Sequence, residues 1–170
     1  LLEERDFPAS QIRLCASERS LGKRIIVNDT DLIVESPTED LFDEVDMVFI
    51  SATGDVSQQL APIAVGKGSL VIDDSSVFRM DPDVPLVVPE VNPGDIDFHR
   101  GIIAIPNCST TPLVMVLKPL NDINPVKRVI VDTYQSVSGT GSVAVNELAA
   151  QSKVVLDRGI AASGVYPHPI

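Results

Sequence analysis

The sequence is poor in positive charge and has no long apolar run. Its 170 residues include 13 lysines and arginines against 24 aspartates and glutamates, which gives a formal charge of −11 at pH 7. The basic residues are scattered singly or in pairs, so no basic face is available for nucleic acid or an anionic membrane. No stretch reaches the roughly 18 apolar residues that a membrane span requires. The composition therefore argues against nucleic-acid and membrane partners.

Cysteine is also scarce, since Cys15 and Cys108 are the only two. Two cysteines are too few for a disulfide framework, and each is interpreted as a reduced thiol. Residues 1–5 (LLEER) lack the basic and then apolar order of a signal peptide. Apolar residues make up 44% of the chain, which is ordinary for a protein that buries a core. We therefore expect a folded, soluble, cytoplasmic protein, and we predict no metal site.

Apolar runs and alternating patterns predict an α/β chain. Strands are predicted at 12–16, 25–27, 32–34, 47–50, 70–72, 102–105 and 126–134, and helices at 1–7, 56–65, 109–120 and 143–156. A strand, the small-residue turn 51–54, a helix, a glycine stop and a further strand make a βαβ unit, whose crossover requires a parallel sheet. The predicted fold is a doubly wound α/β sheet. Ligands bind such sheets at the carboxyl ends of the strands, so 51–54 and 73–76 are expected on the functional edge.

One feature of nucleotide-binding sheets is missing. No G-x-G-x-x-G fingerprint precedes the first predicted helix. Either the fold does not bind a dinucleotide, or its first strand and glycine loop are absent. By length the chain suggests one domain, but it begins at Leu1 without Met and stops at Ile170 without an obvious cap. We therefore expect a fragment of a longer protein.

The sharpest local pattern is Pro106-Asn107-Cys108-Ser109-Thr110-Thr111-Pro112. It follows an apolar strand, and its hydroxyl residues and proline are typical of a helix N-terminus. A thiol there faces the positive end of the helix dipole and backbone N–H groups, which favour the nucleophilic thiolate and are expected to hold an oxyanion. A buried structural cysteine is the alternative for any single cysteine, and it is the interpretation preferred for Cys15.

These residues resemble the aspartate-semialdehyde dehydrogenases. Five ordered blocks carry the resemblance, namely Ala16-Ser17-Glu18-Arg19-Ser20-Leu21-Gly22, Val71-Ile72-Asp73-Asp74-Ser75-Ser76-Val77-Phe78-Arg79-Met80, Val84-Pro85-Leu86-Val87-Val88-Pro89-Glu90-Val91-Asn92, the Pro-Asn-Cys segment, and Thr133-Tyr134-Gln135-Ser136-Val137-Ser138-Gly139-Thr140-Gly141. The resemblance implies an incomplete Rossmann-like NADP-binding domain at 1–106, without its first strand and glycine loop. The start of an α+β catalytic and dimerisation domain would then occupy 107–170.

The resemblance implies a chemistry for Cys108. The thiol attacks aspartate 4-semialdehyde, hydride passes to NADP, and phosphate cleaves the resulting thioester to 4-aspartyl phosphate. The biosynthetic direction is the reverse and leads toward lysine, methionine and threonine. Gln135 would position the substrate, and Arg79 and Asn107 would bind substrate or phosphate. Without the resemblance, Arg79 would be interpreted as a surface ion pair with Asp81 or Asp83, and Gln135 as a polar strand end.

Cofactor residues are also implied. An arginine after the second strand of the sheet accepts a 2′-phosphate, which favours NADP, although the neighbouring Glu18 would repel that group. Asp74 stands where the family usually has Asn. The expected cofactor-binding set is Ser17, Arg19, Ser20, Ser51, Thr53, Gly54, Asp74, Ser75, Ser138 and Gly139. Gly139 would pass close to the nicotinamide because it lacks a Cβ.

The family's general base, a histidine, and its substrate-binding arginine belong to a C-terminal half that this chain does not contain. His99 and His168 do not match the catalytic position and are interpreted as solvated or capping residues. The resemblance implies a homodimer or homotetramer. An acyl-CoA or other acyl-phosphate reductase on the same scaffold, and a catalytically silent binding or dimer-forming fragment, stay open as alternatives.

Overall fold

The computed structural model describes residues 4, 5 and 7–170, which form two compact units divided between Ile123 and Asn124. The helix predicted at 1–7 lies largely outside the described residues, because positions 1–3 and 6 are not among them. Within the described ranges, every helix is too short or too polar to cross a membrane.

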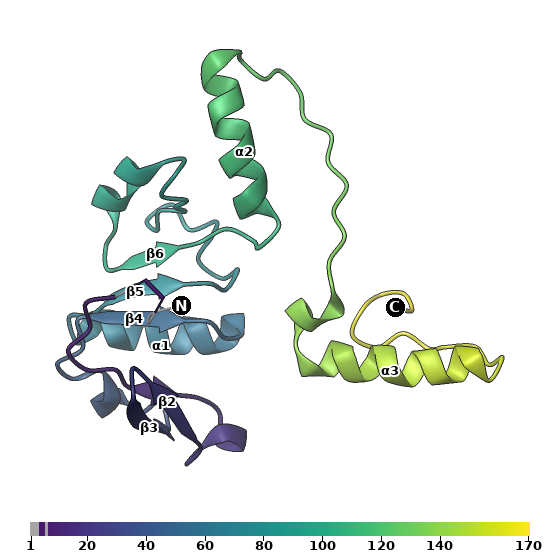
Figure 1. Ribbon diagram of the computed structural model, residues 1–170, viewed down its shortest axis with the longest axis horizontal. Helices are drawn as coiled ribbons and strands as arrows, with labels where there is room; N and C mark the ends of the chain where they lie inside the picture. Colours follow the sequence, from purple (N-terminus) through teal and green to yellow (C-terminus); the bar gives the residue numbers. More distant parts are fainter. Residues whose placement is uncertain (1–3, 6) are drawn as a thin grey trace. The chain divides into compact units, whose positions relative to one another are not determined.

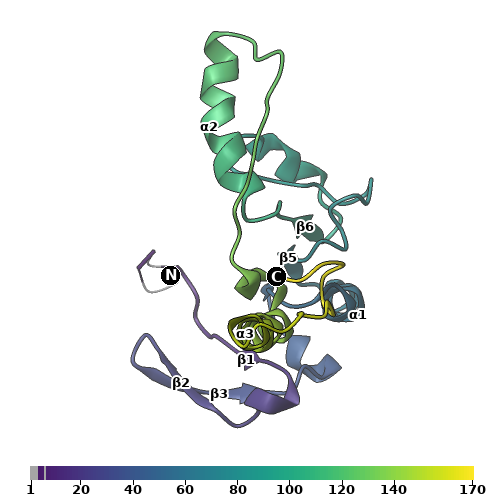
Figure 2. The same cartoon turned by 90° about the vertical axis from the view of Figure 1, so that its right-hand side faces the viewer.

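The first unit opens with a small mixed sheet in the order β1-β3-β2 (Figures 1 and 2). Its strands are β1 (Leu14–Cys15), β2 (Arg24–Val27) and β3 (Thr30–Glu35). β2 and β3 form a hairpin whose two turn residues, Asn28 and Asp29, have φ of 48° and 58°. Positive φ at both positions is the geometry of a type I′ turn, which matches the twist of a two-stranded ribbon. β1 pairs parallel with β3 and is shorter than the predicted 12–16.

The second sheet is parallel, with β5 in its centre. Its strands are β4 (Met47–Ile50), β5 (Leu70–Asp73) and β6 (Ile102–Ala104), and helix α1 (Gly54–Gly66) forms the crossover between the first two. This arrangement confirms the predicted βαβ unit and the α/β fold class. Ile50, Asp73 and Ala104 are partners across the three strands. All three strands therefore end at one level, and the loops that follow them share one edge.

The core of this unit lies between α1 and the parallel sheet. Phe42, Ile50, Ala61, Ala64 and Val71 form a cluster of buried side chains. The two alanines lie on the same face of α1 and are fully buried, so the helix backbone comes close to β5 (Figure 1). This packing holds the ends of β4 and β5 side by side.

Helix α2 (Thr110–Ile123) corrects one predicted boundary. The predicted helix ends at residue 120, just after Pro119, but α2 continues through this proline to Ile123. The ring of Pro119 is exposed, so it displaces no core side chain. Lys118 Nζ also pairs with Asp122 Oδ2 at 2.6 Å across the proline, which supports the last turn.

The second unit contains helix α3 (Ser142–Leu156), close to the predicted 143–156. The C-terminal segment folds back along it (Figure 1). Gln151, buried on α3, donates to Ala162 O at 2.8 Å and accepts the N–H of Ile170 at 2.6 Å. Glu147 accepts the N–H of Gly164 at 2.8 Å. These contacts give the unit its own compact fold.

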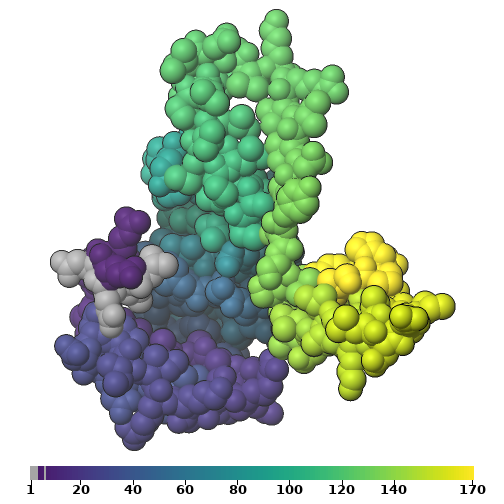
Figure 3. Space-filling model, turned by 45° about the vertical axis from the view of Figure 1, so that its right-hand side comes forward, coloured from purple at the N-terminus to yellow at the C-terminus, as the bar shows by residue number. Residues whose placement is uncertain are grey.

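The strand predicted at 126–134 is not formed. The segment is extended and exposed, and it makes a thin column of atoms in the space-filling view (light green in Figure 3). A strand needs a neighbour that shares its backbone hydrogen bonds, and no strand of the described residues pairs with this one. The β-branched composition is that of a strand, but the pairing is missing.

Candidate active site

The carboxyl edge of the parallel sheet gathers several predicted site residues. Ser51, directly after β4, donates its hydroxyl to Asp74 Oδ2 at 3.2 Å, directly after β5. A backbone bond from Asp74 N to Ile50 O at 2.9 Å joins the same two strand ends. The turn 51–54 and the loop 73–76 therefore lie on one edge, as the sheet argument predicts.

The loop after β5 is built on a buried carboxylate that sequence analysis did not single out. Asp73 is fully buried, and its Oδ2 accepts the hydroxyl of Ser75 at 2.7 Å. Ser75 Oγ in turn accepts the N–H of Val77 at 3.2 Å. Asp73 Oδ1 has no hydrogen-bond partner among the described residues. The available signal was an acidic residue at the end of an apolar, buried strand.

Arg79 does not form the ion pair with Asp81 or Asp83 that was the alternative interpretation. In the described part of the chain, Asp83 pairs with Arg100 at 2.9 Å. Arg79 instead donates from Nε to Ile105 O at 2.9 Å and from Nη2 to Asp74 O at 2.8 Å. Its guanidinium thus bridges the loops that follow β5 and β6.

Cys108 lies on the exposed turn between β6 and α2. Its thiol contacts Asn107 Oδ1 at 3.9 Å. The same oxygen accepts the N–H of Ser109 at 2.9 Å and its hydroxyl at 2.7 Å. Asn107 therefore stabilises the turn through its side-chain oxygen. The Cys108 thiol lies at the start of α2, as the sequence predicts.

The expected oxyanion role of the helix N-terminus needs a correction. The N–H of Ser109 is taken by the Asn107 side chain, and the N–H groups of Thr110 and Thr111 donate to Asn107 O at 2.9 and 3.1 Å. Asparagine is a strong helix cap because its side-chain oxygen satisfies such a donor, here the N–H of Ser109. The N–H groups of Ser109, Thr110 and Thr111 are therefore engaged, and the oxyanion prediction is wrong for these three.

The predicted adenosine-side residues follow β1. Ser17 precedes a short 3-10 helix (Glu18–Ser20), and the N–H of Ser20 donates to Ser17 O at 2.9 Å. Glu18 and Arg19 are both exposed. Both side chains of this neighbouring pair are therefore accessible to solvent.

A nicotinamide cofactor fits the sheet edge on three observations. The hydroxyls of Ser51 and Thr53 are exposed, and Thr53 makes no capping bond to the first turn of α1. Backbone N–H groups at a helix start suit phosphate oxygens. The unpartnered Asp73 Oδ1 leaves one acceptor at the same edge. At Gly54 a Cβ would meet Val77 at 3.7 Å, an ordinary contact, so packing alone does not require this glycine.

The remaining predicted residues belong to the second unit. Gln135 is exposed at the end of the extended segment. Ser138 and Gly139 lie in a 3-10 helix (Val137–Thr140), where the Ser138 hydroxyl donates to Ser136 Oγ at 3.0 Å. A Cβ added at Gly139 would meet no atom of the chain within 4 Å. The space that a side chain would occupy at Gly139 is therefore open, which is a condition for the predicted close approach of a ligand.

The other cysteine and the two histidines differ from Cys108. The interpretation of Cys15 as a buried cysteine is wrong, because β1 is a two-residue strand at the edge of its sheet and Cys15 is exposed there. Partial burial of the thiol still raises its pKa, and the Glu35 carboxylate raises it further. His99 Nδ1 accepts the N–H of Gly101 at 3.1 Å, and His168 stacks on Tyr166 with ring centroids 6.2 Å apart. Both histidines are exposed, in agreement with a solvated or capping role.

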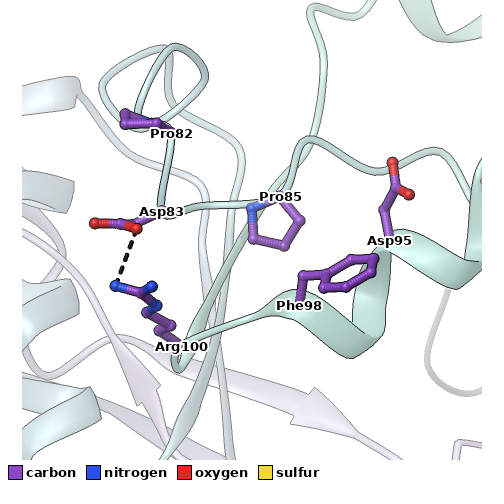
Figure 4. Close-up of a pocket in the computed structure, with 6 residues that line it drawn as sticks. All are labelled: Pro82, Asp83, Pro85, Asp95, Phe98 and Arg100. Atoms are coloured by element: carbon purple, nitrogen blue, oxygen red, sulfur yellow. Dashed lines mark ion pairs between the residues drawn. The ribbon is translucent and has the colours of Figure 1, made fainter.

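A pocket of about 420 Å³ lies beside the Asp83–Arg100 ion pair (Figure 4). Its lining contains none of the predicted site residues and consists of Pro82, Asp83, Pro85, Asp95, Phe98 and Arg100. The described side chains hold no group of three or more His, Cys, Asp and Glu that would bind a metal ion.

Comparison with known proteins assigns the family. The model described as "Semialdehyde dehydrogenase, NAD binding domain" matches residues 1–99, and "Semialdehyde dehydrogenase, dimerisation domain" matches 117–170. An aspartate-semialdehyde dehydrogenase of Prochlorococcus marinus is 45% identical over 170 residues, which are 100% of this chain and 50% of the relative. The chain spans about half the length of the curated relatives it matches.

Solved structures agree with this assignment. A crystal structure of aspartate semialdehyde dehydrogenase II from Vibrio cholerae, complexed with ASA, superposes with a TM-score of 0.87 at 43% identity, over 99% of this chain and 51% of that one. A structure of aspartate semialdehyde dehydrogenase with NADP from Candida albicans gives 0.57 at 31% identity, over 68% and 40%. The chain belongs to the semialdehyde dehydrogenase family.

Proposed function

We propose that this member of the semialdehyde dehydrogenase family interconverts aspartate 4-semialdehyde and 4-aspartyl phosphate, with NADP as cofactor and Cys108 as nucleophile. The observation that carries the proposal is the exposed thiol on the turn between β6 and α2, at the edge where a parallel sheet binds its ligands. Identity to aspartate-semialdehyde dehydrogenases over the whole chain supports the substrate.

In the proposed reaction the sulfur of Cys108 adds to the aldehyde carbon and gives a thiohemiacetal. Bound NADP supplies the hydride acceptor, and the product on the chain is a thioester. A phosphate oxygen then attacks the thioester carbonyl, the C–S bond breaks, and the thiolate of Cys108 is restored as 4-aspartyl phosphate leaves. The reverse sequence forms the semialdehyde.

The proposal gives the other residues their roles. Arg79 binds phosphate, Asn107 holds the turn and contacts substrate, and Gln135 positions the substrate at Cys108. Cofactor contacts come from Ser17, Arg19, Ser20, Ser51, Thr53, Gly54, Asp74, Ser75, Ser138 and Gly139. The Candida albicans relative was solved with NADP, and the exposed Arg19 side chain favours that cofactor over NAD.

The proposal extends to assembly and metabolism. The match of residues 117–170 to a dimerisation domain supports a homodimer or homotetramer. The reaction would serve the synthesis of lysine, methionine and threonine.

The test compares Cys108→Ser with Cys15→Ser in the full-length protein. Cys108→Ser should lower turnover by about a thousandfold or more while NADPH binding, followed by fluorescence titration, stays within about twofold. Cys15→Ser should keep turnover near the wild-type value, because Cys15 lies in β1 and has no proposed role. Normal turnover in Cys108→Ser would refute the nucleophile. Wild-type turnover with coenzyme A in place of phosphate would favour an acyl-CoA reductase.

A further inference from the structure

We propose that Arg79 is a positioning residue for Cys108, in addition to any contact with phosphate. Its guanidinium donates to Asp74 O and Ile105 O, which belong to the loops that leave neighbouring strands β5 and β6. Ile105 lies three residues before Cys108. The inference rests on the proposed role of Cys108, and it assigns Arg79 a second task in the same site.

The geometry divides the guanidinium into two edges. Nε and Nη2 lie on one edge, and each gives one proton to a backbone carbonyl at 2.9 and 2.8 Å. Of the five N–H donors of an arginine, two on Nη1 and one on Nη2 are left, and one from each of these nitrogens forms the second edge. We call the two bonds to Asp74 O and Ile105 O the clamp. While both are formed, the Nη1–Nη2 edge is the one that can donate two N–H groups to an anion.

The clamp acts on a stretch of chain with little conformational freedom. The N–H of Ile105 donates to Asp73 O at 3.0 Å, so Arg79 and β5 together engage both backbone polar groups of Ile105. Pro106 fixes its own φ and restricts Ile105 to extended conformations. Asn107 then caps α2. The place of the thiol is set by the clamp on one side and the cap on the other.

Arg79→Lys separates the two tasks of Arg79. A lysine keeps the positive charge, but its single ammonium on a flexible stem does not hold two carbonyls in a fixed fork. Loss of the clamp lets the 105–108 segment move, so the thiol spends less time at the start of α2. The matched control is Arg100→Lys, because Arg100 makes an exposed ion pair with Asp83 and has no proposed role in catalysis.

The experiment measures alkylation of Cys108 by iodoacetamide in phosphate-free buffer, with the modified peptide quantified by mass spectrometry. Arg79→Lys should slow the reaction at least about threefold relative to wild type, and Arg100→Lys should leave it unchanged. An unchanged or faster rate in Arg79→Lys overturns the clamp. Because no substrate, phosphate or cofactor is added, this result is separate from the turnover test of the proposed function.

A readout on the wild-type protein keeps the inference testable should Arg79→Lys fold poorly, and a second readout uses the folded variant in turnover. In the wild-type protein, the Nε–H signal of Arg79 in a nitrogen-15 NMR spectrum should exchange with solvent at least about tenfold more slowly than that of Arg100, without phosphate present. Equal exchange overturns the clamp. In turnover, Arg79→Lys should lower kcat as well as raise the KM for phosphate; a change confined to that KM would show phosphate binding alone and also overturn it.

Discussion

The loops after β5 and β6 and the segment 124–136 both carry residues proposed for catalysis, but they differ in what holds them. In the strand-end loops, Arg79 binds two carbonyls and Asp73 is buried against Ser75. In the segment 124–136, the apolar side chains are exposed, with Ile130 at 78% and Tyr134 at 99%. The first region draws its order from contacts within its own unit, whereas the second has few such contacts among the described residues.

The largest expected effect that separates the two regions comes from truncating one valine in each. Val71 is fully buried in the central strand β5, and Val129 in the segment 124–136 is 46% exposed. Val71→Ala should lower the free energy of unfolding by about 2–3 kcal/mol, from lost burial and a cavity. Val129→Ala should change it by about 0.5 kcal/mol or less. Urea unfolding followed by circular dichroism measures both.

Equal losses would contradict the contrast. A large loss in Val129→Ala would mean that the segment 124–136 is packed in solution, for example against a second copy of the chain. A small loss in Val71→Ala would mean that the parallel sheet contributes less to stability than its burial indicates.

A serine pair tests the same contrast with hydrogen bonds. Ser75→Ala removes the donor to Asp73 Oδ2 and leaves the buried carboxylate without a side-chain partner, which should cost about 1–2 kcal/mol. Ser138→Ala removes an exposed hydroxyl that donates to Ser136, and should cost about 0.5 kcal/mol or less. Thermal unfolding by calorimetry gives both values. If Ser138→Ala proved the more costly, the second unit would depend on its own polar contacts more than its exposure indicates.

The contrast also explains which features could be predicted from the sequence. Hydrophobic periodicity located β4, α1 and β5, and the parallel sheet placed Ser51 and Asp74 on one edge because strand ends in a βαβ unit share a direction. The start of α2 followed from the residues around Cys108. These features depend on local patterns and on the handedness of the chain.

Other features depended on contacts between residues far apart in the sequence. Arg79 reaches Ile105, 26 residues away, and nothing in the local pattern distinguishes this bond from an ion pair with Asp81. The strand at 126–134 failed because composition indicates strand propensity but not whether a pairing partner is present. The oxyanion prediction was wrong for three N–H groups for a local reason: the side chain of Asn107 accepts the N–H of Ser109, and its backbone oxygen accepts those of Thr110 and Thr111.

The smallest expected effect concerns Cys15, which shares the first unit with Cys108 but lies in β1 rather than on a strand-end turn. Burial and the Glu35 carboxylate raise the pKa of Cys15, so less thiolate is present at pH 8 than for an ordinary thiol. Glu35→Gln removes only the second cause, so it should lower the pKa partway and speed alkylation of Cys15 by about threefold or less. Iodoacetamide labelling in the Cys108→Ser background measures the rate. A slower reaction in Glu35→Gln would contradict the charge effect.

Because the folded pKa of Cys15 is raised, the contribution of its neutral thiol to stability is present below its ordinary pKa and is lost as the pH rises through the raised value. Glu35→Gln should therefore weaken the loss of stability on the alkaline side while leaving stability at pH 7 nearly unchanged.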